Sequence, residues 1–106
     1  MALVASLDGL PVGTVSLVEG DHPLDPTPIC CLAGLYVLPA WRRLGIGRQL
    51  CRAALRQALR LRAGPVGLFT RDAEGFYRRL GWHCELVTAL PAPGAPVLGS
   101  FMIYSE

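Results

Sequence analysis

The fold of this chain is decided at residues 35–48, Leu35-Tyr36-Val37-Leu38-Pro39-Ala40-Trp41-Arg42-Arg43-Leu44-Gly45-Ile46-Gly47-Arg48. An apolar run ends at a proline there, and two glycines flanked by arginines lead into a segment dominated by Leu and Ala. A helix start presents unpaired N–H groups and the positive end of the helix dipole, and glycine lets a phosphate approach the backbone closely. The stretch therefore predicts a diphosphate site. A tight turn that carries solvated arginines is the alternative.

The residue types exclude several other phosphate and amine chemistries. The third glycine of the dinucleotide fingerprint G-x-G-x-x-G would fall at Leu50, so the stretch lacks that motif. All ten basic residues are arginine. Walker-A phosphate loops, Schiff-base enzymes and pyridoxal phosphate enzymes need a lysine amine, so these classes are excluded. The net charge of +2 is too small to predict binding to nucleic acid.

Apolar and β-branched runs separated by turn residues predict strands at residues 2–7, 11–19, 29–38, 66–70, 82–90 and 97–104. Asp8-Gly9 predicts a tight turn between the first two strands, and Pro-Ala-Pro-Gly at residues 91–94 predicts a loop between the last two. Residues 20–28, rich in proline and aspartate, predict another loop. This pattern favours a sheet.

Two helices are expected among these strands. The first covers residues 45–62 and stops at Gly64-Pro65, and the second covers residues 73–80, with Asp72 as its N-cap and Gly81 after its last turn. A strand, a helix and a further strand in succession predict a right-handed crossover and a parallel pair at the middle of the sheet. The expected fold class is α+β with a mixed sheet, in a single domain of residues 1–106.

Two ordered motifs carry a resemblance to a known family. Arg42-x-x-Gly45-x-Gly47, directly after a strand, resembles the R/Q-x-x-G-x-G/A signature of the GNAT superfamily of acetyltransferases. Phe76-Tyr77-Arg78-Arg79-Leu80-Gly81-Trp82 resembles the second signature of that family, an aromatic-Tyr pair leading to Leu-Gly-aromatic. The resemblance extends to Tyr104. It implies the GNAT acyl-CoA N-acyltransferase fold in an N-terminally short form, without the first strand and first helices.

The resemblance implies an N-acetyltransferase that moves the acetyl group of acetyl-CoA to a primary amine, of a small molecule or a protein N-terminus, by direct attack in a ternary complex. The strand end would offer backbone groups to pantetheine, and residues 42–48 would wrap the diphosphate. Tyr77 would be the catalytic acid for the departing thiolate, with a core aromatic as the alternative. The cofactor-binding residues would be Leu35, Tyr36, Val37, Arg42, Arg43, Gly45, Ile46, Gly47 and Arg48.

The general base stays unassigned. GNAT enzymes often carry a glutamate on the central strand, but residues 32–38 contain no acid. Glu19, Asp21 and His22 at the end of the second strand could face the acceptor, or could form a solvated turn. No metal is expected, because the four cysteines show no C-x-x-C pair and no histidine at ligand spacing, and we interpret them as reduced, buried small hydrophobes.

Arginines recur every fourth residue along the first helix, at Arg48, Arg52, Arg56 and Arg60, with Arg62 beyond them. Like charges at this spacing repel by about 0.2–0.5 kcal/mol per pair, so the row does not serve helix stability. One interpretation is a solvated face. The other is contact with an anion, whether the 3′-phosphate of CoA, an acidic protein or RNA.

Three classes of function stay open: an acetyltransferase, a catalytically silent acyl-CoA-binding regulatory module, and an anion-binding interaction protein built on the arginine helix. No apolar run approaches the roughly 20 residues of a membrane span and Met1-Ala2-Leu3-Val4 lacks a basic signal start, so we expect a cytoplasmic protein and no membrane partner. Because a GNAT fold without its first elements leaves a strand edge and apolar sheet surface open, we also expect a homodimer, or else a truncated chain with an incomplete acceptor pocket.

Overall fold

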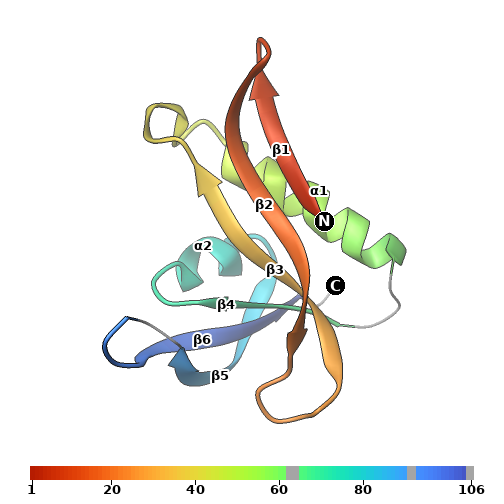
Figure 1. Cartoon of the computed structure of the whole chain (residues 1–106), viewed down its shortest axis with the longest axis vertical. Coiled ribbons are helices and arrows are strands. Elements are labelled where there is room, and N and C mark those ends of the chain that lie inside the picture. Colours follow the sequence, from red (N-terminus) through yellow and green to blue (C-terminus); the bar gives the residue numbers. More distant parts are fainter. Residues whose placement is uncertain (62–64, 91–92, 105–106) are drawn as a thin grey trace.

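A computed structural model describes residues 1–61, 65–90 and 93–104 of the chain. Its helices are α1 (Ile46–Leu61) and α2 (Glu74–Arg79), preceded by a short 3₁₀ helix, η1 (Pro39–Trp41). Figure 1 shows the helices beside one twisted sheet. The strands of this sheet are β1 (Ala2–Leu7), β2 (Leu10–Asp21), β3 (Pro28–Val37), β4 (Val66–Thr70), β5 (Trp82–Leu90) and β6 (Val97–Tyr104).

The strands form a mixed sheet in the order β1-β2-β3-β4-β6-β5. β3 and β4 are parallel, in register from Cys30 beside Val66 to Leu32 beside Leu68, and the other neighbours are antiparallel. A parallel pair needs a crossover connection, which α1 provides. The predicted α+β class with a parallel pair at the middle of the sheet is therefore confirmed.

Residues that readily adopt positive φ angles form two of the predicted turns. Asp8 and Gly9 have positive φ angles of 51° and 80°, as a two-residue hairpin turn of type I′ requires, and they join β1 to β2. Gly81 has a φ of 101° just after α2, where a left-handed residue ends the helix. Both turns confirm the prediction from sequence.

Both helices pack on one face of the sheet (Figure 1). The core between them includes Val15 and Leu32 from the sheet, Ala54 from α1 and Tyr77 from α2. On the opposite face a smaller cluster forms around Phe101, which is fully buried and meets the His22 ring at 5.0 Å between ring centroids. The loop that begins at His22 thus covers part of the second face, where the described helices do not pack.

The structure corrects one predicted cap and shifts several boundaries. Asp72 is not the N-cap of α2: Ala73 holds that position without a side-chain bond, and its N–H donates instead to Thr70 Oγ1 at 3.1 Å. β2 runs on to Asp21, two residues past its predicted end, because the backbone stays paired with β3 as far as Pro28. The expected helix end at residues 62–64 and the start of the 91–94 loop lie outside the described residues.

The divergence of β3 from β4 positions the site. β4 pairs with β3 only as far as Leu32, whereas β3 continues to Val37. Gly34, at a φ of +64°, marks an irregularity in the pairing of β3 with β2 at the same level. The last residues of β3 therefore present one backbone edge that β4 does not cover.

Candidate functional site: a cavity between β3, α1 and α2

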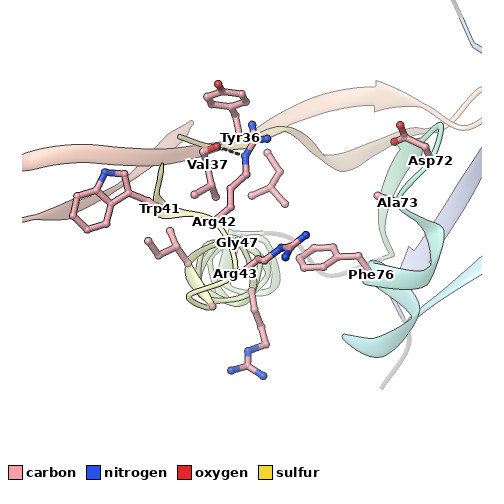
Figure 2. Close-up of a pocket in the computed structure, with 13 residues that line it drawn as sticks. Tyr36, Val37, Trp41, Arg42, Arg43, Gly47, Asp72, Ala73 and Phe76 are labelled. Atoms are coloured by element: carbon pink, nitrogen blue, oxygen red, sulfur yellow. Dashed lines mark hydrogen bonds between the residues drawn. The ribbon is translucent and has the colours of Figure 1, made fainter. Parts of the chain in front are cut away.

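A cavity of about 540 Å³ opens where β3 diverges from β4 and α1 begins. Figure 2 shows Trp41 and Arg42 on one side of it and Asp72 and Phe76 on the other. Every residue predicted to bind the cofactor lines this cavity. Its lining is Leu35, Tyr36, Val37, Trp41, Arg42, Arg43, Gly45, Ile46, Gly47, Arg48, Asp72, Ala73 and Phe76.

The turn into α1 places residues with unpaired backbone N–H groups in the lining of this cavity. Arg43 and Gly45 have positive φ angles of 67° and 83°. A non-glycine residue in the left-handed region costs of order 1–3 kcal/mol and is typical of ligand sites. The first helical bond runs from Gln49 N to the Gly45 carbonyl at 3.1 Å, which leaves the N–H groups of residues 46–48 without a partner in the helix. These groups and the helix dipole favour an anion at this point.

Gly47 shows the room that such an anion needs. A Cβ atom at this position would lie 3.7 Å from Phe76, 3.8 Å from Val37 and 3.9 Å from Leu35. These side chains are all part of the cavity wall. A methyl group at Gly47 would therefore project into the cavity at the first turn of α1, and the glycine keeps that space open.

The side chain of Arg42 turns back toward β3. Its Nε donates to the Val37 carbonyl at 2.8 Å, the bond drawn dashed in Figure 2, and its guanidinium carbon lies 5.3 Å from the centroid of the Tyr36 ring. A guanidinium over an aromatic ring gains a cation–π attraction. Arg42 thus ties the end of β3 to the turn before α1 on this side of the cavity.

Tyr77 lies in the core beside the cavity and is not part of its lining. The ring is 9% exposed and meets the Phe76 ring at 5.1 Å and the Trp82 ring at 6.3 Å between centroids. Burial, with a smaller effect of Cys51, raises the pKa of the Tyr77 phenol to about 12. The phenol therefore keeps its proton at neutral pH.

Four lining residues were not predicted from the sequence: Trp41, Asp72, Ala73 and Phe76. Phe76 could have been found, because it precedes Tyr77 in the second motif. Asp72 follows β4 in the sequence, and only the turn into α2 brings it to the cavity. It carries the sole carboxylate of the lining, across the cavity from Arg42 (Figure 2).

The other candidates from the sequence lie elsewhere. Glu19, Asp21 and His22 line no part of the cavity, and Nδ1 of His22 accepts a bond from Leu24 N at 3.0 Å. Cys30, Cys31 and Cys51 are buried, Cys84 is half-buried, and all are free thiols. Within the described ranges, three or more His, Cys, Asp or Glu side chains nowhere gather to hold a metal ion, and neither helix could cross a membrane.

Solved structures share this fold. A GCN5-related N-acetyltransferase from Rhodopseudomonas palustris superposes with a TM-score of 0.83 at 24% identity over 100% of this chain and 61% of its own. Arabidopsis thaliana Naa50, solved with the bisubstrate analogue CoA-Ac-MVNAL, gives 0.76 at 17% identity over 99% and 72%. An acyl-CoA N-acyltransferase from Pseudomonas aeruginosa gives 0.75 at 24% identity over 98% and 67%. The chain thus spans less than two thirds of the first of these.

The sheet order, the diverging parallel pair and the cavity at the start of α1 define an acyl-CoA N-acyltransferase fold. The acetyltransferase (GNAT) domain family matches residues 1–84. The chain belongs to this family of acetyltransferases. No curated protein sequence matches the chain.

Proposed function

We propose that this protein transfers the acetyl group of acetyl-CoA to a primary amine. The observation that carries the proposal is the cavity at the start of α1, with its unpaired N–H groups, its arginines and the space above Gly47. This lining fits a long ligand with a diphosphate near one end. When bound, acetyl-CoA supplies the thioester, whose C–S bond breaks as the amine nitrogen forms the new C–N bond.

The charges of the cavity orient the ligand. Arg43, Arg48 and the N–H groups of the first turn attract the diphosphate, and the uncovered edge of β3 offers backbone groups to the pantetheine amides. Asp72 lies across the cavity, where its carboxylate would repel the diphosphate but attract an ammonium group. The thioester and the amine therefore belong at the Asp72 side.

We assign Tyr77 as the proton donor to the departing thiolate. Because the pKa of this phenol is about 12, it holds its proton at neutral and mildly alkaline pH. Its ring contacts Phe76, which forms part of the cavity wall, so Tyr77 lies directly behind the wall of the cofactor cavity. Under the alternative, the ring is a core element and water supplies the proton.

Two further expectations accompany this function. We expect a cytoplasmic protein in which residues 1–106 are one domain, and a homodimer that covers the sheet face opposite the helices. Val4, Val18 and Phe69 on that face are 59%, 44% and 39% exposed, and among the described strands β1 lies at the edge of the sheet and pairs on one side only. An open apolar face and a free edge favour pairing between chains, most simply about a two-fold axis.

Calorimetry with acetyl-CoA, followed by an amine screen read as release of free CoA thiol, tests the proposal. We expect cofactor binding, a raised thermal midpoint and turnover with small amines or peptide N-termini as acceptors. Binding without turnover over a broad panel would favour a silent acyl-CoA-binding module. Absence of binding at millimolar cofactor would sink the proposal.

A further inference from the structure

A second cavity, of about 390 Å³, opens on the helix side of the cofactor cavity. The two cavities share Arg43, Gly45, Arg48 and Phe76, so they form one continuous hollow past the start of α1. Phe76 projects from α2 toward that start (Figure 2). The full lining of the second cavity is Arg43, Gly45, Arg48, Arg52, Phe76, Arg79 and Leu80.

This second cavity carries a concentrated positive charge. Of the described side chains that line it, four are arginines and none is acidic. Among the described residues, none of these four forms a salt bridge, whereas Arg78, adjacent in the chain to Arg79, pairs with Glu74 at 2.8 Å. Arg78, which lines neither cavity, is thus paired with a carboxylate, and the four arginines around the second cavity are available to an anion.

The arginines converge from three separate parts of the chain. Arg43 comes from the turn before α1, Arg48 and Arg52 lie one turn apart on α1, and Arg79 comes from the last turn of α2. Like charges held around one hollow repel each other, so the arrangement costs free energy when no anion is bound. A multiply charged anion that contacts both helices would attract these arginines, so the arrangement would then lower the free energy of the complex.

We propose that this second cavity binds the 3′-phosphate of CoA and that Arg52 and Arg79 recognise it. The inference rests on the proposed function, because the order of groups along CoA places the ribose 3′-phosphate directly after the diphosphate. A diphosphate at Gly45 and Arg48 therefore brings the 3′-phosphate into the adjoining cavity. Arg52 and Arg79 line only this second cavity, so they discriminate a nucleotide that carries a 3′-phosphate from one that does not.

The test is a pair of calorimetric titrations, with CoA and with 3′-dephospho-CoA, on the whole chain and its variants. We expect the wild-type chain to bind CoA about tenfold more tightly, the magnitude of two or more exposed guanidinium–phosphate contacts. Arg52→Gln and Arg79→Gln should each lower this ratio, and the double variant should bring it close to one. Adenosine 3′,5′-bisphosphate against 5′-AMP measures the same ratio without pantetheine.

Arg56→Gln is the matched control, because Arg56 lies one turn beyond Arg52 on α1 and lines neither cavity. It should leave the ratio unchanged, and Arg52→Lys should retain most of it by keeping the charge. Equal binding of CoA and dephospho-CoA to the wild-type chain would overturn the inference and leave the proposed function standing. A ratio that persists in the double variant would also overturn it. Failure of both ligands to bind would remove the proposed function itself.

Discussion

Replacing Gly47 by alanine should make the protein more stable and its cofactor affinity weaker. Gly47 is the second residue of α1, and an added Cβ would meet its neighbours at 3.7 Å or more, which is ordinary van der Waals contact. Alanine in place of a helical glycine stabilises by about 0.5–1 kcal/mol, with less expected in a first turn. The free energy of unfolding should therefore rise by a few tenths of a kcal/mol.

The same methyl group should weaken binding of acetyl-CoA. It would project into the cavity at the first turn of α1, where the N–H groups of residues 46–48 lie, and should hold the diphosphate away from them. A hydrogen bond to a charged group contributes about 1.5–3 kcal/mol, so the loss of one raises the dissociation constant by roughly 10- to 150-fold. Urea unfolding and calorimetry on the same preparation measure the two opposite effects.

Gly75→Ala is the control, since Gly75 is the other glycine within a described helix and lines neither cavity. Its Cβ would meet only Arg79 Nη1, at 3.7 Å. This variant should gain a similar stability and keep its affinity. An unchanged dissociation constant in Gly47→Ala would refute the placement of the diphosphate, and a clear loss of stability would refute the account of the packing.

Three further outcomes are expected. Tyr77→Phe should lower kcat by about 10²–10⁴ with little change in cofactor affinity, if the phenol is the acid, and an unchanged kcat would make the ring a core element. Burial raises the pKa of Cys31 and Cys51 from 9.0 to about 11, and that of Tyr77 from 10.0 to about 12. Their stabilising contribution is therefore complete below about pH 9 and falls by about 1.4 kcal/mol per pH unit per group between the unfolded and folded pKa values, from 9.0 to about 11 for the thiols and from 10.0 to about 12 for the phenol. Urea midpoints should be level to pH 8 and fall above pH 9, less steeply in Cys51→Ala, and a level profile to pH 10.5 would contradict the burial of these groups. Light scattering after size exclusion should report a dimer, and a monomer with full turnover would contradict the predicted pairing.

Much of the fold follows from local chemistry that a sequence displays directly. Asp8-Gly9 suits a turn with two positive φ angles, and the apolar runs mark the strands. The glycines and arginines at residues 42–48 indicate the anion site. A helix start offers free N–H groups, and a glycine there leaves them accessible to a phosphate. The structure places all the predicted cofactor-binding residues around one cavity at this helix start.

Contacts between distant segments of the chain decided the position of Asp72 and the surroundings of the arginines on α1. Asp72 was predicted as a helix cap, but Thr70 takes the bond to Ala73, and the turn after β4 carries the Asp72 carboxylate to the cavity instead. The row of arginines on α1 was ambiguous by itself. Only the packing of α2 against the same core brings Arg79 beside Arg52 and encloses a charged hollow, because the periodicity of one helix contains no information about which element lies across from it.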